Sequence, residues 1–295
     1  MTPVVREMTY RLDGYEFGTP WHDVLVARGG FDPGAIEGRA QDVDKPDDDG
    51  SWMGRDYLTG PETAFKLTVN TRSGADGMAA LAQLAQAWRA DSVRTTPGAL
   101  SVLQYYRGGR WWRVYGRARK FAAAPKEFTR EQVQLVDATF KAAAPFVEDD
   151  AWRSITRQML VPPSGGGLVL PAVPPFELRP GSQARYGAID VGGLSPAQFT
   201  VTVKGPTTGT LSNVRVSGDG WAIDVVRPIA YDETLYIDTR SQRVTVNGVS
   251  MPGAISARSR LDARLSPGPQ SFGFEGSDPS GTATATLGWR DTYPI

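Results

Sequence analysis

The chain contains 295 residues, more than one domain of ordinary size usually holds, so we expect two domains. Basic and acidic residues number 32 each, which excludes a global electrostatic attraction to nucleic acid or to an anionic membrane. Cysteine is absent, which excludes disulfides, and neither a signal-peptide pattern nor a membrane-spanning apolar run occurs, so we expect folding in the cytoplasm and no membrane insertion.

Short strands and one main helix are predicted in the first part of the sequence. Two short apolar runs flank Asp13-Gly14, a dipeptide that supplies the positive φ angles of a tight β-hairpin. A strand is expected at residues 64–69, and the helix at 76–89, for which Ser73 provides an N-terminal signal. Apolar side chains recur there at helical spacing, at Met78, Leu81, Leu84, Ala85 and Trp88.

Residues 28–51 form a polar stretch that is too long for a routine connection between two elements. Its glycines and its acidic run at residues 47–50 predict a long loop that is either mobile or part of an interface. The acidic run does not match a calcium-binding EF-hand loop, since Lys45 stands at the first ligand position and Asp56 at the last. We therefore expect no metal site in this loop, and its role stays open.

A second hairpin is expected from residues 100–106, a turn at 107–110, and residues 111–119. Period-two alternation in its second arm places arginine and aromatic side chains on one face and smaller apolar ones on the other. One face is therefore expected to be core, and the other to be exposed in the manner of a protein interface. The candidate interface residues are Tyr105, Trp111, Arg113, Tyr115 and Arg117.

Two other interpretations of this hairpin remain open. Its face is either an ordinary solvated sheet surface, or a platform on which bases stack while arginines contact phosphates. Zero net charge disfavours binding to nucleic acid, and no sequence-specific contact with nucleic acid is expected.

The domain boundary is expected where proline and glycine accumulate, at residues 162–181. This linker would divide a β-rich N-terminal domain with one helix, residues 1–161, from a C-terminal domain, residues 182–295. In the C-terminal part, alternating apolar residues predict strands, and turn signals separate them at the spacing of a β-sandwich. The predicted fold class is mainly β.

No catalytic set is evident in the sequence. His22 is the only histidine, and it leads directly into a predicted strand. Residues 148–150 are acidic and could supply half of a glycosidase carboxylate pair, but an exposed turn is the simpler interpretation. The glycines at 165–167 lie between prolines and not at the start of a helix, where a phosphate-binding loop would place them. We expect neither an enzyme nor a cofactor.

Several segments, taken in order, give the chain a resemblance to the distal tail (Dit) proteins of long-tailed, non-contractile bacteriophages. These segments are residues 112–121, 136–140 with 144–147, 236–239 with 244–248, 265–268 and the ending 287–293. The resemblance covers nearly the whole chain. One departure is at residues 144–147, which read Ala-Pro-Phe-Val where the family often has an Asp-Pro-x-x-Tyr segment.

The resemblance implies a structural virion protein at the tail tip. Its N-terminal domain, of strands plus one helix, would form a ring, typically a hexamer, at the end of the tail tube, and a galectin-like β-sandwich would project from that ring. Such rings join the tail tube protein to the tail-associated hub or fibre protein. Their lumen lets the tape measure protein and then DNA pass.

The alternative function is that of a carbohydrate-binding adhesive protein that contacts the host surface. Galectin-like sandwiches can bind sugars through an aromatic platform and a few polar groups. Trp221 and Trp289 are the candidates for that platform, although both lie in alternating strands, where core positions are expected.

Overall fold

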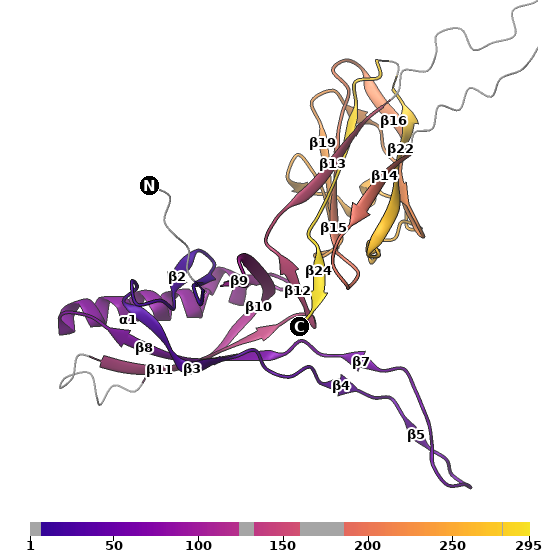
Figure 1. The fold of residues 1–295 in the computed structure, drawn as a ribbon. Helices are drawn as coiled ribbons and strands as arrows, with labels where there is room; N and C mark the ends of the chain where they lie inside the picture. Colours follow the sequence, from indigo (N-terminus) through magenta and orange to yellow (C-terminus); the bar gives the residue numbers. More distant parts are fainter. Residues whose placement is uncertain (1–6, 124–132, 160–185, 279) are drawn as a thin grey trace, which may run out of the picture. The chain divides into compact units, whose positions relative to one another are not determined.

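A computed structural model of the chain describes residues 7–123, 133–159, 186–278 and 280–295. The chain folds as two compact units, one made of Met1–Asp150 with Tyr293–Ile295 and the other of Ala151–Thr292 (Figure 1). Both units are built mainly of antiparallel strands, which confirms the predicted mainly β fold. None of the helices in the described ranges has the length and hydropathy that crossing a lipid bilayer requires.

The division between the units differs from the expected boundary at residues 162–181. It falls between Asp150 and Ala151, and the segment 162–181 lies outside the described residues. Strand β13 (Arg153–Gln158) precedes that segment, β14 (Tyr186–Val191) follows it, and both belong to the second unit. The proline- and glycine-rich segment therefore connects two strands of one unit and does not join the units.

One antiparallel sheet organises the first unit, with the strand order β2-β1-β9-β10-β11-β8-β3, and β12 pairs with β10 and with β24. Asp13 and Gly14 both have positive φ, as the predicted hairpin between β1 and β2 requires. The strands are β1 (Tyr10–Leu12), β2 (Tyr15–Phe17), β3 (Val24–Asp32), β8 (Glu62–Asn70), β9 (Ser101–Arg107), β10 (Arg110–Ala123), β11 (Val133–Ala142), β12 (Phe146–Asp149) and β24 (Thr292–Pro294).

Helix α1 (Gly74–Arg89) packs on this sheet through one side. It begins at Ser73, whose hydroxyl oxygen accepts a hydrogen bond from the Asp76 backbone N–H at 3.2 Å, and this confirms the predicted N-terminal signal. A short helix α2 (Asp91–Arg94) follows it. The buried side of α1 consists of Gly77, Ala80, Leu84 and Trp88, whereas Met78, one of the apolar residues at helical spacing, is exposed.

Aromatic rings fill the space between α1 and the sheet. The Trp88 ring meets Phe65 and Phe17 edge-on, with ring centroids 5.7 and 6.0 Å apart, and its Nε1 donates to the Thr139 carbonyl at 3.1 Å. Tyr10 lies 5.4 Å from both phenylalanines. Because each ring buries a large apolar area, this cluster anchors the helix to β1, β2 and β8.

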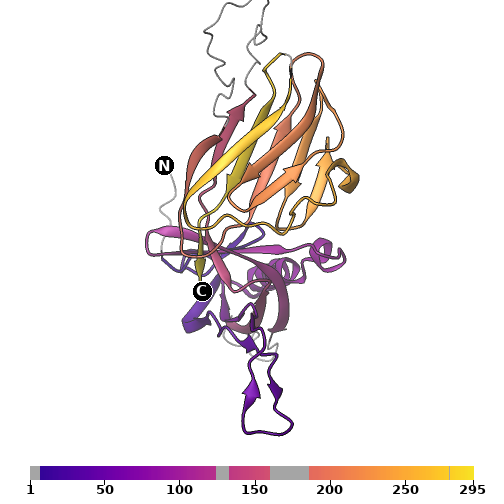
Figure 2. The same ribbon diagram turned by 90° about the vertical axis from the view of Figure 1, so that its right-hand side faces the viewer.

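A two-stranded arm between β3 and β8 extends away from the sheet (Figures 1 and 2). Near the sheet, β4 (Gly38–Arg39) pairs with β7 (Tyr57–Leu58), and further out β5 (Val43–Asp44) pairs with β6 (Ser51–Trp52). Residues 28–51 were expected to be a long loop. They instead form the end of β3, the strands β4 and β5 that lead outward along the arm, and the turn at its tip. The stretch forms paired strands because pairing gives hydrogen-bond partners to the backbone N–H and C=O groups of a long polar segment.

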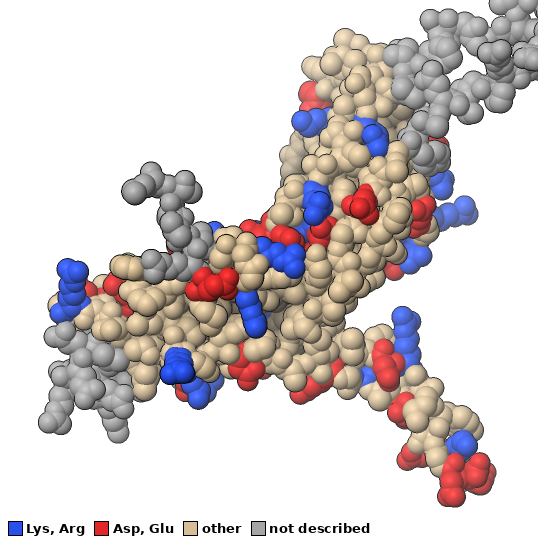
Figure 3. Space-filling model, in the orientation of Figure 1, with Lys and Arg blue, Asp and Glu red and all other residues tan. Residues whose placement is uncertain are grey.

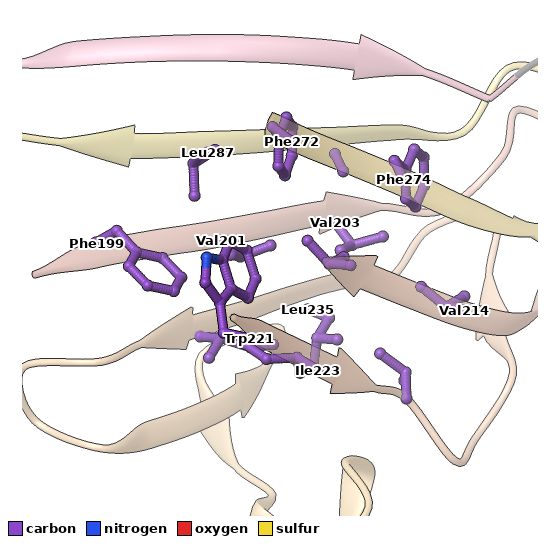
Figure 4. Close-up of a cluster of buried hydrophobic side chains, with 14 of the residues drawn as sticks. Phe199, Val201, Val203, Val214, Trp221, Ile223, Leu235, Phe272, Phe274 and Leu287 are labelled. Carbon is purple, nitrogen blue, oxygen red and sulfur yellow. The ribbon is translucent and has the colours of Figure 1, made fainter. Parts of the chain in front are cut away.

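The second unit is a β-sandwich of two sheets, one in the order β13-β23-β15-β19-β20-β21 and the other β14-β22-β16-β17, with β18 paired to β16. Its further elements are β15 (Phe199–Lys204), β16 (Thr210–Gly218), β17 (Trp221–Asp224), β18 (Ile229–Ala230), β19 (Thr234–Asp238), β20 (Arg243–Val246), β21 (Val249–Ser250), a 3-10 turn (Pro252–Ala254), β22 (Gly268–Ser277) and β23 (Thr284–Trp289). The apolar residues that alternate along the sequence form the core of this unit. Phe199 and Trp221 come from different sheets, and their ring centroids lie 4.6 Å apart (Figure 4).

Candidate protein-interface site

The register of the β9–β10 hairpin decides which aromatic side chains share a face. Trp112 lies directly opposite Tyr105, and Trp111 lies directly opposite Tyr106. Directly paired residues of antiparallel strands point to the same side of the sheet. The hairpin is therefore a surface with two different aromatic faces, one turned to the core and one turned away from it.

Tyr105, one of the predicted interface residues, lies on the core face. Its ring centroid is 5.8 Å from that of Phe31, it packs against the core of the first unit, and burial raises the pKa of its hydroxyl. Tyr106 takes the position beside Trp111 that the interface hypothesis gave to Tyr105. The structure thus separates Tyr105 from the other four predicted residues.

Trp111 stands between a tyrosine and an arginine. Its ring meets the Tyr106 ring edge-on at 5.5 Å, and the guanidinium carbon of Arg11 lies 4.1 Å from its ring centre. Arg11 is itself held by Glu16, which accepts a hydrogen bond from Arg11 Nε at 2.6 Å. Tryptophan, tyrosine and arginine are the residue types most enriched among those that carry the binding energy of protein interfaces.

Arg113 and Tyr115 continue the same face along β10. Arg113 Nε donates to Asp150 Oδ1 at 2.6 Å, and the guanidinium carbon of Arg113 lies 5.8 Å from the Tyr115 ring centre. Burial lowers the pKa of Arg113, but Tyr115 and Asp150 outweigh that effect and raise it. The structure therefore brings Trp111, Arg113 and Tyr115 together on one face, with Arg113 fixed in place.

Arg117 lies further along β10, at the edge of a hollow. Its Nε donates to the Ala99 carbonyl at 2.9 Å, and one of its terminal nitrogens donates to the Thr96 carbonyl at 2.8 Å. Lys141 on β11 lies directly opposite Arg117. Arg119 also lines the hollow, which is open and has a volume of about 330 Å³. We call the hollow with these three cations the basic hollow.

The arm carries an apolar surface that the sequence did not reveal. Apolar side chains on a thin two-stranded arm have no second layer to cover them, and a contiguous apolar surface of this kind usually marks a binding site. The arm is therefore a second candidate interface. Its exposed apolar residues, with exposed fractions from 40% to 81%, are Val43, Trp52, Met53, Tyr57 and Leu58.

Acidic side chains gather at the tip of the arm (Figure 3). Asp47, Asp48 and Asp49 follow one another in the turn between β5 and β6. Lys45 Nζ lies 3.4 Å from Asp48 Oδ2, while Asp47 and Asp49 form no ion pair within the described residues. We call these three residues the acidic turn.

The residues that were considered as candidates for catalysis lie among ordinary structural contacts. His22 Nδ1 lies 2.9 Å from the Thr19 hydroxyl oxygen, and His22 Nε2 lies 3.6 Å from a Glu16 carboxylate oxygen. Glu148 is buried in β12 and does not lie in an exposed turn as expected. Across the part of the chain that the structure describes, no three His, Cys, Asp or Glu residues are placed to hold a metal ion.

The two tryptophans considered as a sugar platform are core residues. Trp221 is 5% exposed and Trp289 is 4% exposed, and both belong to the core of the second unit. A ring that stacks on a sugar must present its face to solvent. The carbohydrate-binding alternative therefore loses the residues on which it rested.

Comparisons with known proteins relate the fold of this chain to that of solved phage proteins. No family model and no curated protein matches the chain. The Dit protein of phage SPP1 is 13% identical to it with a TM-score of 0.61, and the match covers 96% of this chain and 98% of that protein. The chain has the fold of a phage Dit protein. This confirms, at the level of fold, the resemblance that the sequence suggested.

Two further structures agree with this match. They are chains of the phage P2 baseplate in its activated conformation, one with calcium and one with strontium, and both are 12% identical to this chain. Their TM-scores are 0.53 and 0.55, and each match covers 95% of this chain and 97% of the other. The SPP1 protein is described as a paradigm of the hub adsorption apparatus in phages that infect Gram-positive bacteria.

Proposed function

We propose that the chain is a structural subunit of the tail tip of a phage virion. In this role, copies of the chain form a closed ring that joins the tail tube protein to the hub or fibre proteins, and the tape measure protein and then DNA pass through the ring. The number of copies that we expect, six, comes from the resemblance alone. The observation that carries the proposal is the shared fold over 96% of this chain and 98% of the SPP1 Dit protein.

The surfaces of the first unit support a role in assembly. The arm and the Trp111 face lie on different parts of this unit, and each presents the residue types that protein interfaces favour, namely aromatic, methionine and arginine side chains. Two unlike surfaces on one subunit suit a head-to-tail contact, and a head-to-tail contact that closes on itself makes a ring. The proposed role is therefore structural and not enzymatic.

The location in the virion can be tested by electron microscopy of virions that carry the chain. An antibody raised against the purified chain is expected to label the distal end of the tail, opposite the capsid. Tails labelled with an antibody against the tail tube protein serve as the control, because that label is expected along the whole tail. Label on the capsid, or along the tail in the pattern of the control, would contradict the proposal.

A further inference from the structure

We propose that the first unit binds a small phosphate-bearing anion in a pocket beside the basic hollow. This pocket is more enclosed than the hollow, has a volume of about 180 Å³ and lies between the beginning of β9 and the corner where α1 meets α2. Four arginines line it, Arg89, Arg94, Arg117 and Arg119, together with Ser101. We call it the arginine pocket. The inference goes beyond the proposed function and does not depend on it.

The arginine pocket forms because β10 continues beyond its pairing with β9. Strand β9 begins at Ser101, which lies opposite Gly116, so the residues of β10 after Gly116 have no partner in β9. On the other side of the pocket, Ala90 has a φ of 42° and turns the chain from α1 into α2. The end of one strand and the corner between two helices thus build this pocket into the fold.

Positive charge around the arginine pocket exceeds the negative charge beside it. Arg89 and Arg94 both donate to the same carboxylate oxygen of Asp91, at 3.0 and 2.9 Å, so that two cations share one anion. In the part of the chain that the structure describes, no carboxylate forms an ion pair with Arg117 or Arg119. An anion in the pocket would therefore offset a positive charge that the fold leaves unbalanced.

A buried hydroxyl group is a second, independent observation. Ser101 is fully buried and lines the pocket, and its Oγ has no hydrogen-bond partner among the described residues. A buried polar atom without a partner costs free energy, and folded proteins contain few such atoms. An oxygen atom of a bound anion would accept the proton of this hydroxyl and so supply the missing partner.

Size and charge favour a phosphate group as the ligand. A cavity of about 150 Å³ can hold a benzene ring, so the arginine pocket has room for a phosphate group. Near pH 7 such a group carries a charge of about −1.5 to −2 and offers several strong acceptor oxygens, which match the N–H donors of guanidinium groups. The C-terminal end of α1 adds only about half a negative charge, which the arginines outweigh.

The basic hollow leaves space for the rest of a small ligand. Arg117 and Arg119 line both the hollow and the arginine pocket, and Lys141 adds a cation on the open side. A nucleic-acid strand, in contrast, is usually bound along an open groove that contacts successive phosphates. The enclosed pocket therefore favours a small anion over a nucleic acid.

Isothermal titration calorimetry of the full chain with inorganic phosphate tests the site. At constant ionic strength we expect one saturable site per chain. Arg119→Gln and Ser101→Ala should each weaken the affinity roughly tenfold, since each removes a hydrogen bond to a charged group. Arg258→Gln, at an exposed arginine of the second unit, and Ser217→Ala, at another buried hydroxyl without a partner among the described residues, are the matched controls.

The melting temperature of Ser101→Ala separates a ligand site from a structural defect. Without phosphate, the variant should be at least as stable as the wild type, because it lacks a buried hydroxyl that has no partner. At the same millimolar phosphate concentration, the wild type should gain more, because a ligand stabilises the state that binds it more tightly. A difference between the two melting temperatures that phosphate does not change would overturn the inference.

The other outcomes also decide the inference. Absence of both binding heat and a shift in melting temperature at millimolar phosphate would overturn it. Binding that Arg119→Gln and Ser101→Ala leave unchanged would place the phosphate elsewhere and would also overturn it. A single-stranded oligonucleotide that binds where inorganic phosphate does not would overturn the small anion in favour of nucleic acid. Circular dichroism checks that each variant remains folded, and failure of this site would leave the proposed function unaffected.

Discussion

Arg11 holds its guanidinium carbon 4.1 Å from the centre of the Trp111 ring, and Tyr106 meets the same ring edge-on from the neighbouring strand. The interaction orders a large side chain at the surface of the sheet. Tryptophan and arginine that are ordered in this way lose little further freedom when a partner binds. If the Trp111 face is an interface, as we propose, its side chains are therefore ordered before a partner binds.

Truncation of the side chains on this face should weaken assembly and leave the fold unchanged. For Trp111→Ala/Arg113→Ala we expect assembly to weaken by at least tenfold, since hot-spot truncations cost about 2 kcal/mol or more. Circular dichroism should be unchanged, because Val114 on the opposite face keeps its place in the core. Sedimentation velocity measures the assembled fraction. The control is Trp21→Ala, which removes an exposed tryptophan elsewhere in this unit. Normal assembly of the double variant would show that the hairpin is not part of the interface.

Polar substitutions on the arm should separate assembly from stability. Trp52, Met53 and Leu58 are all more than half exposed, so Trp52→Ser/Met53→Ser/Leu58→Ser should change the free energy of unfolding by only about 0.5 kcal/mol for each residue. Assembly should nevertheless be lost, because in the proposed ring these side chains would be buried. Val226→Ser replaces an exposed apolar residue of the second unit and should have neither effect. A triple variant that assembles as well as the wild type would rule out the arm as an interface.

The two units should unfold separately. Phe199 is fully buried in the second unit, and Phe199→Ala should lower the stability of that unit by about 3–5 kcal/mol. Phe65→Ala is the matched change in the core of the first unit. Each variant should shift only its own transition in differential scanning calorimetry. A single transition that both variants shift equally would show that the units unfold together.

Acid should weaken the second unit through Asp278. Burial raises the pKa of this carboxyl, but hydrogen bonds from the Ala283 N–H, the Ser280 hydroxyl and the N–H groups of Ser280 and Thr282 outweigh burial and hold the pKa below its ordinary value of 3.8. Because the pKa is lower in the folded state, the stabilisation is present above pH 3.8 and is lost as the pH falls through the folded pKa.

Asp278→Asn should remove this pH dependence. Two backbone N–H groups, those of Thr282 and Ala283, donate to Asp278 Oδ2 at 2.8 Å, so the variant should lose roughly 2–3 kcal/mol near pH 7. Urea unfolding followed from pH 7 to pH 3 measures both effects. Asp232→Asn, at an exposed carboxylate, is the control. Equal acid sensitivity in Asp278→Asn and the wild type would contradict the assignment.

Local chemistry explains what the sequence predicted correctly. Asp13-Gly14 and Asn247-Gly248 supply positive φ angles at the positions where hairpins turn, and both turns are present. Ser73 caps α1 because its hydroxyl reaches an N–H that the helix leaves unpaired. These signals involve residues that are close together in the sequence, so they can be recognised in the sequence alone.

The features that were not predicted depend on contacts that cannot be recognised in the sequence. The arm is held by two ladders of two residues each, too short to produce a period-two pattern. Tyr105 was expected to share the face of Trp111, but the register of the hairpin was unknown, and a shift of one residue exchanges the faces. Proline and glycine at 162–181 predicted a domain boundary, but those residues connect β13 and β14 of one unit. Composition does not show to which unit the strands on either side of such a segment belong.

The molar mass of the purified chain in solution, measured by size-exclusion chromatography with multi-angle light scattering, tests the central claim most directly. We expect a closed assembly with a mass several times the 31.9 kDa of one chain, formed either alone or after addition of the tail tube protein. Negative-stain images of the same fractions should show rings. A mass that stays at 31.9 kDa under both conditions would contradict the account.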